Sequence, residues 1–204
     1  MALARSQRDG AVRSGSGRGR LIVLSGPSGV GKDTVLAELL PLCPSVRRPP
    51  AYTTRLPRPG EVDGRDYSFV DLVTFQAMES AGDFLETALV HGNHYGTSRE
   101  RVEAIRNDGY DALLKPDVQG AALLRDAGLD ALFLFLAPPS PEALLARLEQ
   151  RGTETPEELA IRTQDAAREL AAASWYQHVV VNDEVSRAAG ALAEILNTSE
   201  PTAR

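Results

Sequence analysis

Residues 21–34, with the sequence LIVLSGPSGVGKDT, decide the fold of this chain. An apolar run that predicts a buried strand is followed by a glycine-rich segment, and a helical pattern begins at residue 33. Glycines let the backbone curl until several N–H groups point into one concavity, which the positive end of the next helix also faces. The spacing of Gly26, Gly31 and Lys32 is that of a P-loop. The stretch therefore predicts a phosphate-binding site between the first strand and the first helix.

The residue after Lys32 is unusual for a P-loop. Ser or Thr normally follows the lysine, and its hydroxyl meets Mg²⁺; here Asp33 holds that position and Thr34 comes next. A carboxylate at this point can bind Mg²⁺ directly or through water, and it repels phosphate oxygens when no metal lies between them. We therefore expect Asp33 to be the candidate magnesium ligand and Lys32 to supply a mobile charge for the outer phosphates.

Composition and charge exclude several classes of protein. The 204 residues suffice for one substantial core with small inserted subdomains. The net charge is −6; five Arg against one Asp in the first twenty residues give +4, so the remainder carries −10. This acidic body argues against nucleic acid as a partner, and no apolar run approaches the roughly 20 residues of a membrane span. The single cysteine, Cys43, is expected to be a packed residue; it excludes an internal disulfide and favours a reducing, cytoplasmic location.

Short apolar runs alternate with helical patterns along most of the chain, which predicts an α/β fold with a parallel sheet flanked by helices on both faces. The region between about residues 50 and 97 is rich in Pro and Gly, and we expect an inserted, mostly β subdomain there, with a strand at 66–70. Residues 1–19 are expected to form a disordered basic arm. The other predicted strands are 21–25, 110–114, 131–136 and 178–181, and the predicted helices are 33–42, 99–107, 119–126, 141–150, 156–173 and 186–196.

A second cluster of anion-binding side chains lies in residues 53–67. Arg55 and Arg58 are separated by Pro57, which stiffens the backbone, and two guanidinium groups can fork onto one phosphate. Tyr67 adds a hydroxyl donor. One P-loop holds one phosphate chain, so this cluster suggests a second phosphate and transfer between two nucleotides.

With these features, the chain resembles the guanylate kinase family. Eight segments match the family's motifs in order: 25–32 (SGPSGVGK), 53–64 (TTRLPRPGEVDG), 66–70 (DYSFV), 91–97 (HGNHYGT), 117–120 (DVQG), 137–140 (APPS), 151–153 (RGT) and 179–183 (VVVND). The resemblance implies transfer of the γ-phosphoryl group of ATP, with Mg²⁺, to GMP or dGMP, giving ADP and GDP (dGDP from dGMP). It also implies a P-loop core at 20–49, 99–146 and 166–197, a GMP-binding subdomain at 50–98, a short helical lid at 147–165 and a C-terminal tail at 198–204.

The resemblance assigns roles to individual residues of this sequence. The GMP phosphate is expected to contact Arg55, Arg58, Tyr67 and Tyr95. The guanine base is expected to contact Glu86, Asp117 and Thr97. The lid arginines Arg147, Arg151 and Arg162 would act with Lys32 and Arg55 on the transferred phosphoryl group. ATP is expected to contact Gly26, Pro27, Ser28, Gly29, Val30, Gly31, Lys32, Asp33 and Thr34, and its adenosine part Asn182.

Three positions depart from the family pattern, and two alternative functions remain open. Asp33 replaces a small or hydroxyl residue, Ala51 stands where a Ser often contacts the guanine carbonyl, and Lys115 stands where an acid often precedes Asp117 by two residues. Ribose bisphosphate kinases of phosphonate metabolism resemble this family and can carry Gly-Lys-Asp. Guanylate-kinase-like scaffold domains bind peptides without catalysis. The sequence leaves open whether the protein is a monomer or a homodimer.

Several conspicuous side chains are interpreted as packing residues. His91 and His94 lack nearby cysteines or a third ligand, so loop packing is favoured over a metal site. Trp175 and Tyr176 are likewise expected to pack in the core.

Overall fold

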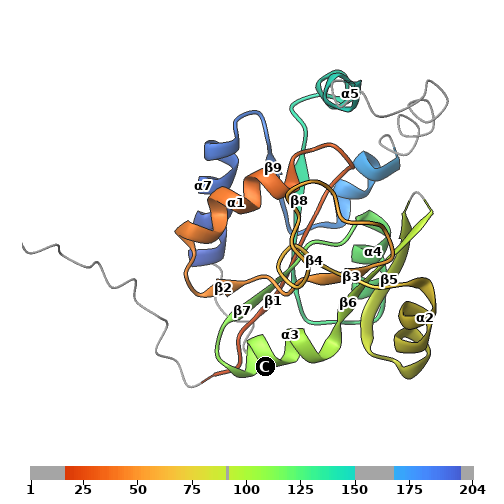
Figure 1. Ribbon diagram of the computed structural model, residues 1–204. Coiled ribbons are helices and arrows are strands. Elements are labelled where there is room, and N and C mark those ends of the chain that lie inside the picture. Colours follow the sequence, from red (N-terminus) through yellow and green to blue (C-terminus); the bar gives the residue numbers. More distant parts are fainter. Residues whose placement is uncertain (1–16, 91, 150–167, 199–204) are drawn as a thin grey trace, which may run out of the picture.

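The computed structural model describes residues 17–90, 92–149 and 168–198. Its main sheet has the order β2-β7-β1-β8-β9, and every neighbouring pair of strands is parallel (Figure 1). The predicted parallel sheet is therefore confirmed. The five strands are β1 (Leu21–Ser25), β2 (Val46–Arg47), β7 (Asp111–Leu114), β8 (Leu132–Ala137) and β9 (His178–Val181).

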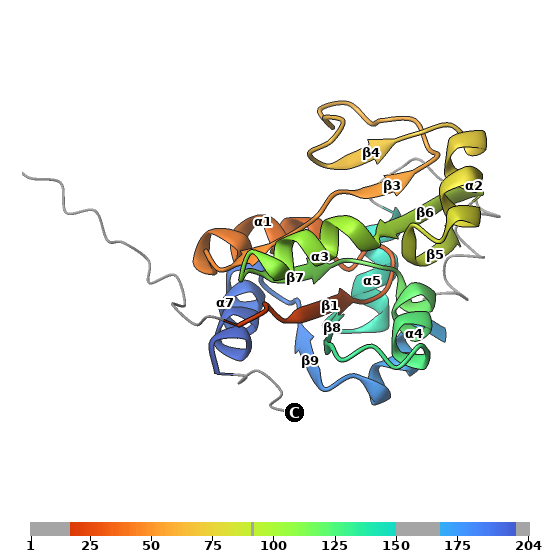
Figure 2. The same ribbon diagram turned by 90° about the horizontal axis from the view of Figure 1, so that it is seen from below.

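Alternating side chains of the central strands supply two hydrophobic clusters, one on each face of this sheet. Ile22 and Leu24 face the first cluster, which contains residues of α1 (Lys32–Leu42), α5 (Pro141–Glu149) and α7 (Val185–Thr198). Leu21 and Val23 face the second, with residues of α3 (Arg99–Asn107) and α4 (Val118–Asp126). Figure 2 shows α1 and α7 side by side, as their contacts require. Cys43 is buried in the first cluster, as predicted.

The inserted region forms a second, mixed sheet with the order β4-β3-β6-β5. β3 pairs in parallel with β4 and antiparallel with β6, and β5 pairs antiparallel with β6. The predicted strand at 66–70 is present as β4. The four strands are β3 (Ala51–Thr53), β4 (Tyr67–Phe69), β5 (Phe84–Val90) and β6 (Asn93–Ser98).

The inserted region also contains a helix that the sequence analysis missed, α2 (Leu72–Ala81). The side chain of Asp71 accepts a hydrogen bond from the backbone N–H of Thr74 at the helix start. Gly82 ends the helix in the left-handed conformation, with φ of 76°. Phe75 is buried on this helix and stacks on Phe84 of β5, with ring centroids 4.8 Å apart. The helix thus provides the mixed sheet with a small core of its own.

Most other predicted elements agree with the structure to within two residues. The strands at 21–25 and 178–181 and the helix at 99–107 match without a shift. The predicted helix at 156–173 lies mainly outside the described residues; its described part is helical to residue 171 and continues as the 3-10 helix η1 (Ala172–Trp175). None of the described helices has the length and apolar character needed to cross a bilayer.

Candidate active site

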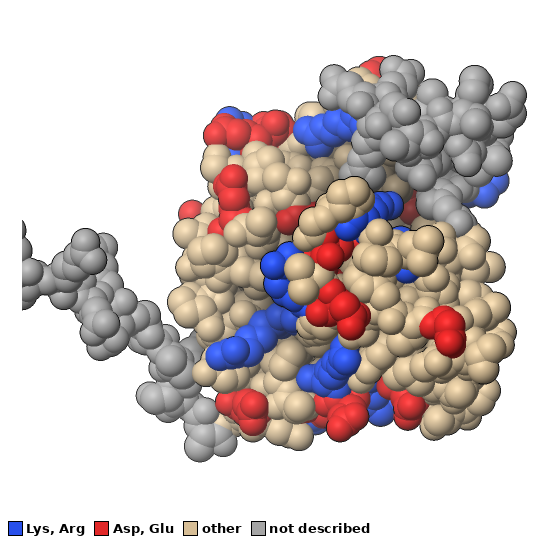
Figure 3. All heavy atoms as spheres, in the orientation of Figure 1, with Lys and Arg blue, Asp and Glu red and all other residues tan. Residues whose placement is uncertain are grey.

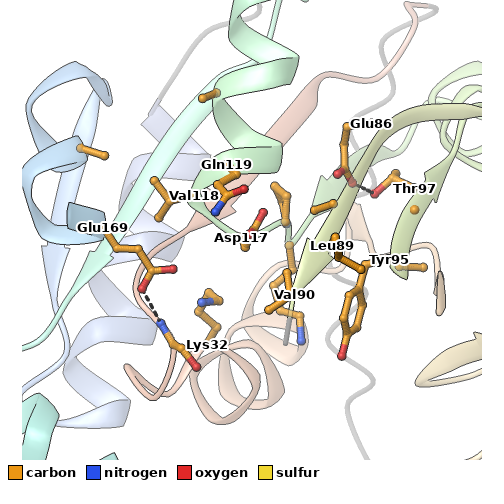
Figure 4. A pocket seen from close by; sticks show the side chains of 18 of the residues that line it. Lys32, Glu86, Leu89, Val90, Tyr95, Thr97, Asp117, Val118, Gln119 and Glu169 are labelled. Carbon is orange, nitrogen blue, oxygen red and sulfur yellow. Dashed lines mark hydrogen bonds between the residues drawn. The ribbon is translucent and has the colours of Figure 1, made fainter. Parts of the chain in front are cut away.

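A cavity of about 540 Å³ lies between the P-loop and the mixed sheet (Figure 4). Its wall comes from six parts of the chain: the P-loop with the start of α1, the segment from β2 into β3, Tyr67 of β4, strands β5 and β6, the segment from β7 into α4, and the residues around η1. The predicted site residues in the wall are Ser28, Lys32, Tyr67, Glu86, Tyr95, Thr97 and Asp117.

The P-loop connects β1 to α1 as predicted. Gly31 precedes the helix with φ of 98°, a conformation that L side chains rarely adopt. Gly26 is equally restricted, because a Cβ atom there would lie 2.3 Å from the carbonyl oxygen of Leu136. The Lys32 ammonium donates to the backbone carbonyls of Gly26 and Pro27, at 2.5 and 3.1 Å. These contacts fold the lysine over the loop.

Burial and, to a smaller extent, the neighbouring Lys115 ammonium together lower the pKa of Lys32 to about 8, against the opposing effect of the Glu169 and Asp33 carboxylates. Glu169 reaches toward the loop from the segment before η1 (Figure 4), and its Oε2 accepts a hydrogen bond of 3.2 Å from the backbone N–H of Ser28. An anionic oxygen therefore occupies part of the turn whose amides suit a phosphate.

Glu86 and Thr97 form a buried polar pair on the mixed sheet. They face each other across β5 and β6, and Thr97 Oγ1 donates to Glu86 Oε1 at 2.6 Å (Figure 4). Glu86 is only 8% exposed, and this burial raises its pKa to about 7. The Thr97 hydrogen bond opposes the rise, whereas the nearby Asp117 carboxylate adds to it. A buried carboxylate needs hydrogen-bond donors to stabilise its ionised form.

A second carboxylate, Asp117, lies beside this pair. It caps α4 by accepting a hydrogen bond of 2.8 Å from the backbone N–H of Gly120, and burial raises its pKa. A Cβ atom at Gly120 would lie 2.6 Å from Glu86 Oε2 and 3.1 Å from Asp117 Oδ1. The absence of a side chain at Gly120 therefore leaves room for both carboxylates at the first turn of α4.

The arginine cluster of the insert is held by an acid in this structure. Both oxygens of Glu61 accept hydrogen bonds of 2.6 Å from Arg55, and these bonds hold the pKa of Arg55 above its ordinary value. The Arg55 guanidinium lies 4.8 Å from the ring centre of Tyr67, whose ring is 6.0 Å from that of Tyr95. Arg58 is exposed, and its backbone N–H donates to Glu61 at 2.8 Å. Neither arginine lines the cavity.

Arg147 and Asn182 lie behind the P-loop. Arg147 donates to the carbonyls of Val30 and Asn182, at 3.2 and 2.9 Å, and Asn182 Nδ2 donates to the carbonyl of Val30 at 2.7 Å. Asn182 is 3% exposed, and its Oδ1 finds no hydrogen-bond partner among the residues that the structure describes. Arg151 and Arg162 lie outside the described residues.

Of the three departures from the family pattern, Ala51 and Lys115 line the cavity and Asp33 lies beside it. The Lys115 ammonium forms an ion pair with Asp33 and donates to the hydroxyl of Tyr67 at 3.1 Å. Burial acts to raise the pKa of Asp33, but the Lys115 charge and hydrogen bond, with further positive groups nearby, lower it. The charge of the exposed Asp33 is thus balanced from across the cavity.

The sequence analysis missed several residues of the cavity wall. Arg48 follows the edge strand β2, and the carboxyl ends of parallel strands are where ligand sites gather. Because this two-residue strand was not predicted, no sequence signal marked Arg48. Trp175 stacks on Tyr176 as a packing residue, with centroids 3.7 Å apart, but it also lines the cavity. His94 packs on Phe75, and His91 is outside the described residues.

Comparison with known proteins decides the family. The guanylate kinase family profile matches residues 18–199. The chain belongs to the guanylate kinase family. The guanylate kinase of Geobacter sulfurreducens is 42% identical over 178 residues, which cover 87% of this chain and 88% of that protein. The guanylate kinase of Nocardia farcinica is 47% identical over 173 residues, 84% of this chain and 90% of that protein.

A solved structure gives the same answer for the fold. The crystal structure of guanylate kinase from Anaplasma phagocytophilum superposes with a TM-score of 0.70 at 31% identity, covering 88% of this chain and 85% of that one. Family membership confirms the resemblance carried by the eight motifs, the P-loop kinase fold and the guanylate kinase function. The roles of individual residues stay predictions.

Proposed function

We propose that this guanylate kinase transfers the γ-phosphoryl group of ATP to GMP or dGMP, giving ADP and GDP or dGDP, respectively, in purine nucleotide metabolism. The observation that carries the proposal is the placement of the buried Glu86–Thr97 pair in the same cavity as the P-loop lysine, Lys32. If the base of a nucleoside monophosphate binds at the Glu86–Thr97 pair and the triphosphate of ATP binds at Lys32, the phosphates of the two nucleotides lie between these points.

The chemistry of the Glu86 pocket fits guanine. The Watson–Crick edge of guanine presents two donors, the ring N–H and the exocyclic amine, and one acceptor, the carbonyl oxygen. Glu86 and Asp117 are acceptors, and the Thr97 hydroxyl becomes free to donate to the carbonyl once guanine replaces it at Glu86. Adenine would leave buried groups of the site unpaired. A site of this kind typically discriminates against such a base by a factor of about 10⁴ or more.

Phosphoryl transfer needs positioning and positive charge more than covalent chemistry. We propose that Arg55, Arg58, Tyr67 and Tyr95 hold the GMP phosphate, for which Arg55 has to leave Glu61. Lys32 holds the outer phosphates of ATP on the P-loop, and Asn182 meets its adenosine part. The attacking oxygen of the GMP phosphate is already anionic, so no side chain has to remove a proton. Arg147, Arg151 and Arg162 would neutralise the charge on the transferred group from the lid side.

Asp33 fits Mg²⁺ as one oxygen ligand. Its carboxylate is 76% exposed at the start of α1, with Thr34 beside it. The described residues contain no group of three or more His, Cys, Asp or Glu side chains able to form a metal site by themselves. The ion therefore has to be shared with nucleotide phosphates, as is usual for Mg²⁺. When bound, Mg²⁺ neutralises phosphate charge.

We also propose the domain organisation given above, with residues 50–98 as the GMP-binding subdomain and 147–165 as the lid. The separate mixed sheet supports the first boundary. The buried free thiol of Cys43 is compatible with a reducing, cytoplasmic location. Figure 3 shows basic and acidic side chains interleaved across one face, which favours small anionic substrates held in a local site over nucleic acid.

An acceptor panel tests the proposed function. ADP release from ATP is measured by a coupled assay with GMP, dGMP, AMP, UMP and ribose bisphosphate as separate acceptors. GMP and dGMP are expected to give turnover at least 100-fold above AMP and UMP. Turnover with ribose bisphosphate and none with GMP would favour the sugar-phosphate kinase, and no turnover with any acceptor would favour a binding domain.

A further inference from the structure

Lys115 lines the cavity but belongs neither to the P-loop nor to the guanine pocket. It directly follows β7, and its side chain is only 9% exposed. Its ammonium contacts the Asp33 carboxylate at the start of α1 and, at 3.1 Å, the Tyr67 hydroxyl on β4. Lys115 therefore connects the P-loop helix to the mixed sheet across the cavity.

The cavity contains two ammonium groups. Lys32 and Lys115 both line the cavity, and they are close enough for the charge of Lys115 to lower the pKa of Lys32. Two neighbouring ammonium groups repel each other, and a nearby anion stabilises their charged forms. The carboxylate of Asp33 supplies one such anion, and it is 76% exposed. Asp33 can therefore turn back to water when a phosphate enters beside Tyr67 and takes its place at the buried Lys115 ammonium.

The neighbouring arginine is less available than Lys115. Arg55 donates to both carboxylate oxygens of Glu61, and such a bidentate ion pair is strong. Lys115 meets one exposed carboxylate and one hydroxyl, and its ammonium carries three donors on a flexible stem. It is thus the cation next to Tyr67 that an incoming phosphate can engage with the least rearrangement.

We propose that Lys115 binds the phosphate of the nucleoside monophosphate directly, beside Tyr67, and that Asp33 holds the ammonium in place until that phosphate arrives. This rests on the proposed function, since the ligand is the acceptor nucleotide. The alternative is a purely structural role, in which Lys115 only fixes the start of α1 through its ion pair with Asp33. The two differ in what Asp33→Asn does: it breaks the ion pair but leaves the ammonium beside Tyr67.

Calorimetric binding of GMP and of guanosine, without ATP or Mg²⁺, separates these roles. Lys115→Met is expected to weaken GMP about 10- to 100-fold, the usual effect of losing one charged hydrogen bond to an anion, and to leave guanosine within about twofold. Lys115→Arg is expected to recover most of the GMP affinity. Asp33→Asn is expected to bind GMP at least as tightly as the wild type. Arg18→Met, which removes the surface pair with Glu103 outside the cavity wall, serves as the matched control.

Three results would overturn the assignment of Lys115: unchanged GMP binding in Lys115→Met, an equal loss of GMP and guanosine, or a loss in Asp33→Asn as large as in Lys115→Met. If Lys115→Met does not fold, as judged by circular dichroism, Lys115→Gln takes its place with the same expected outcomes. A wild-type protein that neither binds nor phosphorylates GMP refutes the proposed function and this inference together. A wild type active on GMP with an unaffected Lys115→Met refutes this inference alone.

Discussion

Replacing Glu86 by Gln tests the guanine pocket through both charge and pH. The wild-type carboxylate is expected to accept two charge-assisted hydrogen bonds from guanine, each worth about 1.5–3 kcal/mol. Gln keeps one acceptor oxygen but turns an N–H₂ group toward the base donors. We therefore expect GMP affinity at pH 8 to fall by about 3 kcal/mol, on the order of 10²-fold, while ATP affinity stays unchanged.

The pH profile gives the sharper result. With a pKa of about 7, Glu86 is roughly nine-tenths ionised at pH 8 and roughly one-tenth ionised at pH 6. Only the ionised form accepts both guanine donors, so the wild type is expected to lose about tenfold in GMP affinity, relative to Glu86→Gln, between pH 8 and pH 6. The GMP phosphate also gains a proton near pH 6, but it does so with both proteins, so the ratio of affinities isolates Glu86.

The assay is calorimetric titration of GMP into both proteins at half-unit steps from pH 6 to pH 8.5. Guanosine, which has no phosphate to titrate, provides the control. A ratio of wild-type to variant affinity that does not change with pH would contradict the buried position of Glu86. Equal weakening of ATP and GMP in Glu86→Gln would remove this residue from the guanine pocket.

The same shift has a consequence for stability. Burial raises the pKa of Glu86 from 4.5 to about 7, so the folded chain binds this proton more tightly than the unfolded chain does. The group's contribution to stability is present below pH 4.5 and is lost as pH rises through about 7, by up to about 3 kcal/mol. Glu86→Gln is therefore expected to melt roughly 5–10 °C above the wild type at pH 8. Most of that difference should vanish by pH 5 in calorimetric melting curves.

Three further substitutions probe the rest of the cavity. Lys32→Met should lower kcat at least 100-fold without lowering the melting temperature, because it removes a buried ammonium; a near-normal rate would show that the P-loop lysine is not used. Gly120→Ala would place a Cβ atom 2.6 Å from Glu86 Oε2, so GMP binding should weaken about tenfold while ATP binding is kept. Thr97→Val removes a bond that lowers the pKa of Glu86, so the midpoint of the GMP affinity profile should move to higher pH; an unmoved midpoint would count against that bond.

Local sequence patterns were enough to predict the P-loop and four of the five strands of the main sheet, but not the two-residue edge strand β2. The strand at 21–25 and the turn up to Lys32 depend on nearby residues, so apolar runs and glycine spacing are sufficient. The helix α2 was missed, although the spacing of Asp71 and Thr74 at its start and of Gly82 at its end is a recognisable capping pattern. The proline and glycine content of the surrounding insert outweighed that signal.

Contacts between distant segments could not be predicted from patterns of this kind. Lys115 and Asp33 are 82 positions apart, and their pairing across the cavity depends on how β7 and α1 pack. The sequence showed each as a departure from the family pattern, but only the fold brings one beside the other. The bidentate grip of Glu61 on Arg55 was similarly hidden, because a charged loop can pair its residues in several ways.

The most direct measurement is a crystal structure of the protein with an inhibitor in which adenosine and guanosine are joined by a chain of phosphates. We predict the guanine edge against Glu86 and Thr97, phosphates on the P-loop amides and Lys32, and the guanosine-side phosphate within hydrogen-bonding distance of Tyr67. A guanine base bound elsewhere, with the pocket between β5, β6 and α4 left empty, would contradict it.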